Sequence, residues 1–595
     1  MADNHTAPPR YDAEEHVVDK PIFADESAHP TNLPPILLDD EGNEARHPTD
    51  EEMKTLRRVS GKIPWIAYFL CLVEFAERAS FYGVKPLFVN YVKRPLPKGG
   101  NGLGAPPKGQ SQAGALDKGS SVANSVSQSF SMLVYALPVY FGWLADQKTG
   151  RFKLIVWGVI ICGVAHVIMV AGGAPKLLAN GKAIAPFMIS VYLLAVGAAM
   201  FKPNISPTLL DQMPNTAPVI KTTKKGETVI VDPEATTETI MLWFYLLINI
   251  GGFMGVPTTY VEKYVGFWLA FFIPLLLYLP LLPMLWVLRN KLVLHPPGGS
   301  NLGHVMRILG ICFKRGGFKN IFRQGFFEVA KPSVIAQSSN PIEVPWTDQF
   351  VNDVHRAFQA TAIFCFFPIQ YINDNGLGEA AGIQSNMLKS DGVPNDVIGN
   401  FNSLVIIMCI PIVNHLLYPW LRKMRIHFGP IARITLGLAI STIGGVGYTV
   451  LNYYGYKLSP CGNLGTSDEC VDAGKVADVS IWWMAIPYSL GGISEIFTNV
   501  PAYGLAYAMA PPNMRGLVSS LNLFSTAIAY AIGLACSGVV RDPYLTWCFG
   551  VPAILGAIAT PAFWFIFKHL DKEEYVLSHE NEYVQDAPEK VKEKL

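Results

Sequence analysis

The sequence predicts an all-α membrane protein with twelve transmembrane helices. Half of its 595 residues are hydrophobic and only 16% are charged, whereas a typical soluble protein has about 25% charged residues. The charged residues are crowded into the two ends of the chain and a few loops, which leaves long apolar stretches between them. A helix needs about 20 such residues to cross the hydrocarbon core of a bilayer.

The apolar stretches form two sets of six. The first set covers residues 63–92, 122–146, 153–172, 185–206, 240–262 and 264–288, and the second covers residues 353–380, 396–421, 428–452, 480–508, 515–540 and 543–568. The longest interruption follows the sixth stretch. We therefore expect an N-terminal six-helix bundle at 61–288, a central loop at 289–352 and a C-terminal six-helix bundle at 353–570.

Basic residues in the loops predict the orientation, because Lys and Arg collect on the cytoplasmic side of a membrane. They follow the second, eighth and tenth stretches and recur in the central loop, at Lys148, Arg151, Lys153, Arg289, Lys291, Arg307, Lys314, Arg315, Lys319, Arg323, Arg422, Lys423, Arg425 and Arg515. The loop after the first stretch is an exception, since its basic residues would lie outside. Because the number of helices is even, both termini lie on the same side, and we expect that side to be the cytoplasm. We expect a multi-pass protein of the plasma membrane.

The segments outside the bundles are polar. Residues 1–60 are acidic and rich in proline, which predicts a disordered cytoplasmic tail, and residues 571–595 form a second cytoplasmic tail. Thr49 and Glu52 have the spacing of a capping box and are expected to start a short surface helix. Apolar residues at helical spacing in the central loop predict an interfacial amphipathic helix, with a mobile linker as the alternative. They are Leu302, Val305, Met306, Leu309, Cys312 and Phe313.

The residues present argue against several classes of protein. The formal net charge is +1, and no basic patch with interleaved aromatic residues predicts binding to nucleic acid. No spacing of cysteines predicts a metal site, and no nucleophile stands beside a base, so we expect neither an enzyme nor a resident cofactor. We also expect a monomer. Cys461 and Cys470 share one polar loop. A disulfide between them is expected if the loop faces an oxidising compartment, and two unpaired thiols are the alternative.

Three ionisable residues lie inside the first apolar stretch: Glu74, Glu77 and Arg78. A charge at the centre of a membrane helix costs about 2.5–3.5 kcal/mol, so it is kept where it lines an aqueous cavity or pairs internally. Glu74 and Arg78 are four residues apart and share a helix face. A cation flanked by two carboxylates holds or releases a proton depending on what else binds the cation. The pattern therefore indicates transport with the proton as coupling ion.

Two further charges lie inside apolar stretches. Lys202 precedes a proline in the fourth stretch and is a candidate anchor for a substrate carboxylate; the alternative is a lysine that extends to the membrane surface. Glu495 lies in the middle of the tenth stretch and is a candidate contact for a substrate amine. Its alternative is a structural carboxylate with a basic partner. Lys202 and Glu495 together would suit a zwitterion.

Weaker candidates for substrate contact are polar residues within the stretches. They are Lys85 in the first, Tyr135 in the second, Asn249 in the fifth, Gln370 in the seventh and Asn402 in the eighth. For each of them ordinary packing or a place at the membrane surface is the alternative.

Several motifs together resemble the proton-dependent oligopeptide transporter family (POT, or PTR) of the major facilitator superfamily. The sequence is similar to that of a fungal member. The resemblance covers about residues 50 to 570. In chain order the matching motifs are Glu74-x-x-Glu77-Arg78 with Phe81-Tyr82-Gly83, Gly142 to Arg151, Lys202-Pro203-Asn204, Phe244-Tyr245 to Asn249-x-Gly251, and Glu495.

The resemblance implies the major facilitator fold and a symporter that imports di- and tripeptides with protons by alternating access. It implies that Glu74, Glu77 and Arg78 couple protons. It further implies that Lys202 pairs with an acidic residue of the seventh helix and contacts the peptide carboxylate. By the same resemblance Tyr135 and Asn249 line the pocket, while Asn402 and Glu495 lie on its amino-terminal side. The implied partners are short peptides, protons and the lipid bilayer.

Three positions depart from the family pattern. Lys85 replaces an arginine and loses its bidentate geometry, Phe81 replaces a tyrosine, and Gln370 and Tyr371 stand where the family has a carboxylate. Asp374, one turn further on, is a candidate substitute as the partner of Lys202. These departures keep two rivals open: a symporter for a non-peptide anion or small metabolite, and a nutrient sensor that does not transport.

Overall fold

The twelve predicted stretches all form helices in the computed structural model. It describes residues 37–38, 44–49, 51–52, 56–107, 112–213, 218–223, 226–294, 301–316, 325–337, 343–424, 428–509 and 515–586. The N-terminal half contains α2 (Trp65–Val84), α3 (Leu87–Lys93), α4 (Gly119–Leu144), α5 (Arg151–Gly172), α7 (Ile184–Leu210), α8 (Pro233–Gly252), α9 (Gly255–Tyr264), α10 (Phe267–Tyr278) and α11 (Leu281–Leu288). The prediction of an all-α membrane fold is confirmed.

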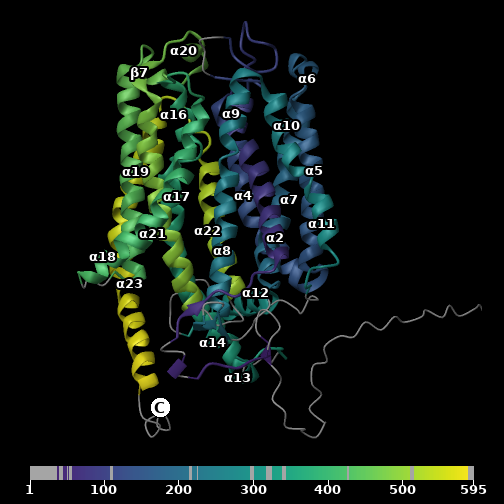
Figure 1. The fold of residues 1–595 in the computed structure, drawn as a ribbon. Coiled ribbons are helices and arrows are strands. Elements are labelled where there is room, and N and C mark those ends of the chain that lie inside the picture. Colours follow the sequence, from purple (N-terminus) through teal and green to yellow (C-terminus); the bar gives the residue numbers. More distant parts are fainter. Residues whose placement is uncertain are drawn as a thin grey trace, which may run out of the picture.

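The C-terminal half stands beside the first as a second group of long helices (Figure 1). It contains α14 (Asp348–Thr361), α15 (Phe367–Asn375), α17 (Phe401–Ile412), α18 (Tyr418–Lys423), α19 (Pro430–Leu458), α21 (Ala485–Met509), α22 (Arg515–Ala535) and α23 (Leu545–Asp586). Short helices connect these, among them α6 (Pro175–Ala179), α12 (Asn301–Ile311), α13 (Pro332–Ala336), α16 (Ala380–Gln384), η7 (Asn395–Asn400) and α20 (Asp468–Asp472).

Breaks within several predicted spans follow from proline. The first span divides into α2 and α3 at Pro86, and the sixth divides into α10 and α11 at Pro280. Proline has no backbone N–H and its ring clashes with the preceding turn, so a helix interior breaks or bends there. In the part of the chain that is described, seven helices are both long and apolar enough to cross a membrane unaided. α2 is not among them, because Glu74, Glu77 and Arg78 lie within it.

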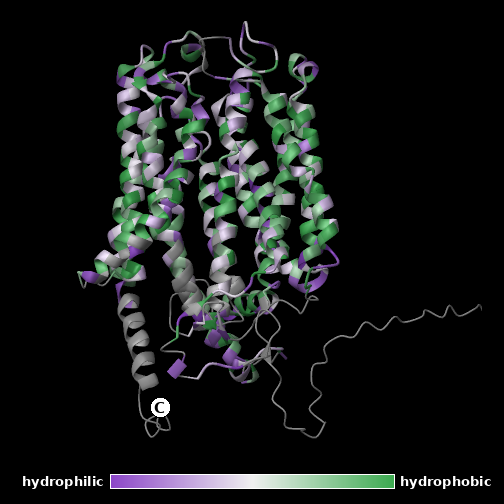
Figure 2. Ribbon diagram, in the orientation of Figure 1, coloured by the Kyte–Doolittle hydropathy of each residue, from purple (hydrophilic) through white to green (hydrophobic). Residues whose placement is uncertain are grey.

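Hydropathy separates the middle of the molecule from its two ends (Figure 2). At one end lie α6, α20 and a disulfide that joins Cys461 to Cys470, and we call it the disulfide end. At the opposite end lie α12, α13 and the last turns of α23, and we call it the tail end. The helices between the two ends carry most of the apolar residues (Figure 2).

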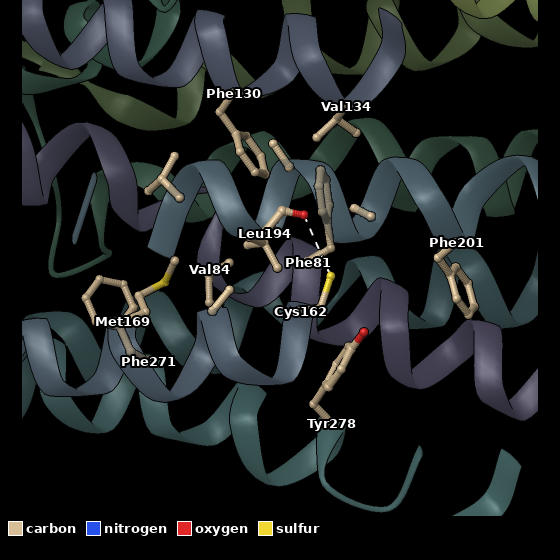
Figure 3. Packing of buried hydrophobic residues seen from close by; sticks show 14 of the residues in the cluster. Phe81, Val84, Phe130, Val134, Cys162, Met169, Leu194, Phe201, Phe271 and Tyr278 are labelled. Carbon is tan, nitrogen blue, oxygen red and sulfur yellow. Dashed lines mark hydrogen bonds between the residues drawn. The ribbon is translucent and has the colours of Figure 1, made fainter. Parts of the chain in front are cut away.

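The core of the N-terminal half is built from interlocking aromatic and small side chains (Figure 3). The rings of Phe81 and Phe130 stack with centroids 5.4 Å apart. α5 and α7 approach closely because glycines face each other, and a Cβ on Gly158 would lie 2.8 Å from the carbonyl oxygen of Gly197. Small residues of this kind let membrane helices pack backbone to backbone.

Short strands lie at the two ends. At the tail end β3 (Arg58–Val59), β5 (Thr228–Val231) and β4 (Val219–Thr222) form a sheet in that order. β1 (Leu37–Leu38) pairs with β2 (Glu44–Ala45) in an antiparallel arrangement, and β6 (Leu388–Lys389) pairs with β7 (Ala477–Ser480) in a parallel one. β1, β2 and β3 thus fall inside the segment 1–60, for which we expected a disordered tail.

The helix expected in the central loop is α12. Its Val305 and Ile308 are fully buried in one apolar cluster with Phe327 and Trp346, whereas Met306 is exposed. Part of its apolar face therefore packs on the protein itself.

Candidate functional site

The charged residues of α2 form one compact ion-pair group. Arg78 Nε lies 3.0 Å from Glu74 Oε1, and Arg78 Nη2 lies 2.5 Å from Glu77 Oε2. All three side chains are buried. One guanidinium faces two carboxylates, so the group carries an excess negative charge unless a proton or another cation joins it. A neighbouring cation is Lys202, which interacts electrostatically with both glutamates.

α7 places Lys202 against aromatic rings. Lys202 Nζ lies 3.8 Å from the ring centroid of Tyr135 and 5.6 Å from that of Phe81. An ammonium over an aromatic face is stabilised by about 0.5–2 kcal/mol. Among the described residues Lys202 forms no ion pair with a carboxylate, so its ammonium is a candidate partner for an anionic substrate group.

A pair of stacked tyrosines joins the two halves beside Lys202 and Lys85. The ring of Tyr135 on α4 stacks on that of Tyr530 on α22, with centroids 5.7 Å apart. Lys85 Nζ lies 5.5 Å from the Tyr530 centroid. The structure therefore brings Lys85, Tyr135 and Lys202 together, and it adds Tyr530, which the sequence had not indicated.

The C-terminal half contributes Glu495. Its Oε1 accepts a hydrogen bond of 3.0 Å from Asn402 Nδ2. The bond is possible because α21 and α17 nearly touch: a Cβ on Gly492 would lie 2.6 Å from the carbonyl oxygen of Asn402. Glu495 interacts electrostatically with Tyr245 of α8 in the N-terminal half, and with Tyr530 and Asp374 of its own half.

The side-chain hydrogen bonds of Asn249 and Gln370 stay within their own halves. Asn249 Nδ2 donates to the carbonyl of Tyr245 on its own helix, at 2.8 Å. Gln370 is buried within the C-terminal half, where its Nε2 donates to Asp374 Oδ2 at 2.8 Å and to Ser494 Oγ at 3.3 Å. The structure therefore does not bring Gln370 to the lysines and tyrosines of the other half.

Asp374 is not the partner of Lys202. It is buried beside Gln370, and a Cβ on Gly491 of α21 would be in ordinary contact with it, 3.4 Å away. Among the described residues Asp374 makes no ion pair with Lys202, so the suggested substitution is wrong in this structure. Asp374 and Gln370 share one face of α15, and that face is directed toward α21 of the C-terminal half.

The loop motif after α4 has a structural explanation. Arg151 Nε lies 3.2 Å from Asp146 Oδ1, and Arg151 Nη1 lies 3.1 Å from Asp211 Oδ2. The arginine thus ties the start of α5 to the ends of α4 and α7 at the tail end.

At the disulfide end, polar side chains join the halves in a first cluster. Asn90 Nδ2 of α3 donates to Asn395 Oδ1 at 3.0 Å and to Asp396 Oδ2 at 2.6 Å, both in η7. Asn90 also donates to Glu262 of α9 at 3.0 Å. Lys263 Nζ donates to the carbonyl of Gly392 at 2.9 Å.

A second cluster joins α4 to the segment between α15 and α16. Ser127 Oγ and Gln128 Nε2 both donate to Glu379 Oε1, at 2.6 and 3.1 Å. The backbone N–H of Glu379 donates to Asn124 Oδ1 at 2.7 Å. Together the two clusters join the halves at the disulfide end. The run of polar residues at the start of α4, absent from our site prediction, was the signal that could have revealed this contact.

Comparison with known proteins identifies the family. Residues 152–550 match the model of the POT family. The chain is 44% identical to the MFS-type transporter ucsM of an Acremonium species, over 91% of this chain and 90% of that protein. It is 35% identical to the peptide transporter PTR2 of Candida albicans, over 89% of this chain and 86% of that protein.

A solved structure shares the fold. The POT family transporter PepTSo superposes with a TM-score of 0.62 over 86% of this chain and 99% of its own, at 20% identity. The chain has the helices, the buried charges and the sequence relatives of a transporter, and it belongs to the POT family.

Proposed function

We propose that the chain is a symporter that imports di- and tripeptides together with protons. The observation that carries this proposal is the division of charge at the site: two lysines in the N-terminal half and Glu495 in the C-terminal half, with tyrosines of both halves between them. A peptide is a zwitterion, so its carboxylate suits the lysines and its ammonium suits Glu495. Contacts with the termini and backbone tolerate many side chains.

The ion-pair group of α2 supplies the coupling. Glu77 shares Arg78 with Glu74, and Lys202 lies close enough to act on both. When a peptide carboxylate engages Lys202, that positive charge is withdrawn from the glutamates, and a proton on a carboxylate oxygen compensates for it. When the peptide leaves, Lys202 is again free to stabilise ionised Glu77, and the proton is released. Binding of the peptide and of the proton then favour each other.

The arrangement of the ends supports alternating access. We propose that the tail end is cytoplasmic and that the disulfide end faces outside, where a disulfide persists. Polar clusters close the disulfide end in this structure, so we take it as a state that faces inward. Outward opening requires that these clusters separate while the tail end closes.

The test is uptake of labelled dialanine into proteoliposomes with an inward proton gradient. We expect accumulation that a protonophore abolishes. Binding of dialanine without flux would instead support the sensor, and the absence of both would contradict the proposal.

Lys202→Gln is expected to weaken the binding of a free peptide about tenfold or more, because a hydrogen bond to a charged group contributes about 1.5–3 kcal/mol. The measurement compares dialanine with its C-terminal amide as competitors of uptake. The unaltered protein should prefer the free acid, and the variant should treat the two alike. Lys182→Gln, an exposed residue at the disulfide end, is the control. A preference for the free acid that survives in Lys202→Gln would contradict the role of Lys202.

A second candidate is a symporter for an organic anion or other small metabolite. The chain is more similar to an MFS-type transporter than to the peptide transporter of Candida albicans. Lys85 and Lys202 also face aromatic rings and, among the described residues, form no ion pair with a carboxylate. Competition of dialanine uptake by nitrate, amino acids and aromatic carboxylates distinguishes the two candidates, since a peptide transporter should be inhibited by peptides alone.

A further inference from the structure

A segment that precedes α2 is bound along the loop between α7 and α8. We call it the strap; it comprises the described residues 44–49, 51–52 and 56–61. The loop contains a hairpin of β4 and β5, in which Val219 lies opposite Val231 and Thr222 opposite Thr228. The strap covers both edges of this hairpin.

Backbone hydrogen bonds hold the strap on each edge. On the β5 edge, the N–H groups of Ile230 and Asp232 donate to the carbonyls of Arg57 and Val59, both at 3.0 Å. On the β4 edge, the N–H of Ile220 donates to the carbonyl of Arg46 at 3.0 Å. An isolated two-stranded hairpin is marginally stable in water, so the strap contributes to the order of the hairpin that it covers.

Charged side chains reinforce the contact. Arg57 donates twice to Glu227 in a bidentate arrangement, from Nε to Oε1 and from Nη2 to Oε2, each at 3.1 Å. Between its two contacts with the hairpin the strap contains a turn at Thr49. The backbone N–H of Thr49 donates to the Glu52 carboxylate at 2.9 Å, and Glu52 also forms an ion pair with Arg46. The hydrogen bonds from Arg46 and Thr49 lower the pKa of Glu52 to about 2. Its carboxylate therefore stays ionised until the pH falls toward that value, and the turn keeps its ion pair at neutral pH.

The strap is attached to the helices that carry the site. α7, which carries Lys202, leads into the hairpin, and α8, which carries Asn249, begins directly after it. The N–H of Gly61 donates to Thr236 Oγ1 in the first turns of α8, at 2.8 Å. From Gly61 the chain continues into α2, which carries the ion-pair group. One short segment thus links the tail ends of three helices.

We propose that the strap is a conformational brake that favours the state closed at the disulfide end. In this structure the strap is bound while the clusters at the disulfide end are formed. In this proposal the tail ends of α2, α7 and α8 shift relative to one another as they close on the other half when the disulfide end opens. The strap joins these three helix ends within the N-terminal half, so it opposes that shift. A contact made in one state shifts the equilibrium toward that state by its own free energy. The inference uses the alternating access of the proposed function, but its test needs no substrate.

The experiment measures how readily the disulfide end opens. Ser127 is buried in the cluster with Glu379, so Ser127→Cys reports opening through its reaction with a membrane-impermeant maleimide. In this reporter background we compare the unaltered strap with Arg57→Glu, Glu227→Arg and the double exchange. Lys314→Glu, exposed on the segment after α12, controls for a reversed charge at the tail end. The protein without Ser127→Cys gives the labelling of its own cysteines.

Each single exchange is expected to raise the labelling rate about two- to fivefold, the effect of losing an exposed ion pair. The double exchange should return the rate to its starting value, and Lys314→Glu should leave it unchanged. Unchanged labelling in both single exchanges would overturn the proposal. So would a rise that the double exchange does not reverse, because the effect would then come from charge or misfolding and not from the pair. Neither result depends on whether the substrate is a peptide.

Discussion

Glu77→Gln is expected to abolish accumulation of peptide against its gradient while exchange of peptide across the membrane continues. Gln keeps the size of the side chain and its hydrogen bond to Arg78, but its amide does not bind and release a proton. With Glu77 neutral at all times, peptide flux is no longer tied to the proton gradient. An inward gradient of one pH unit supplies about 1.4 kcal/mol per proton, which sustains about tenfold accumulation. In the variant the ratio of inside to outside peptide should fall to about one.

The measurement uses proteoliposomes with the gradient imposed and then with equal pH and labelled peptide on one side only. The second condition reports exchange and shows that the variant is folded and able to cycle. Glu469→Gln, an exposed carboxylate in α20, is the matched control and should accumulate peptide normally. Accumulation by Glu77→Gln at the level of the control would exclude Glu77 as the coupling residue and direct attention to Glu74.

Gly492→Ala is expected to reduce uptake at least tenfold, whereas Gly491→Ala, one residue earlier, should be close to the unaltered protein. A Cβ on Gly492 would lie 2.6 Å from the backbone oxygen of Asn402, a distance that no side-chain rotation relieves. α21 must then move away from α17, and the hydrogen bond of 3.0 Å between Asn402 and Glu495 is lost. Overpacking of this kind costs about 1–3 kcal/mol.

The adjacent glycine makes the comparison sharp. A Cβ on Gly491 would lie 3.4 Å from Asp374, which is an ordinary contact. Both variants add one methyl group to the same helix, and they differ only in the direction in which that methyl group points. Peptide affinity and uptake rate are measured for each, with thermal stability of the purified proteins as the check on folding. Equal uptake by the two variants would contradict the close approach of α21 and α17 as the feature that positions Glu495.

The buried charges show where a reading of the sequence succeeds. Glu74, Glu77 and Arg78 lie within two turns of one helix, so their proximity follows from helical geometry and from the cost of an unpaired charge in a membrane. The structure forms both ion pairs. Their roles in coupling stay predictions, as do those of Lys202 and Glu495.

Asp374 and Tyr530 show where such a reading fails. Asp374 is one turn from the expected position, but it turns into its own half and bonds to Gln370. Tyr530 stacks on Tyr135, about 400 residues away in the chain, and nothing in the local sequence of α22 indicates that contact. The contact between Tyr135 and Tyr530 is set by the packing of one helix against another, and so is the side of the C-terminal half toward which Asp374 points.

The sequence by itself determined the twelve helices, the division into two halves and the membership of the POT family, because hydrophobicity, proline and short motifs act over a few turns of chain. Only the tertiary structure decided which polar groups meet: Glu495 with Asn402, Glu379 with Ser127 and Gln128, and Arg57 with Glu227. Each of these pairs joins segments that are distant along the chain. Their contact depends on the packing of whole helices, which no local pattern of residues specifies.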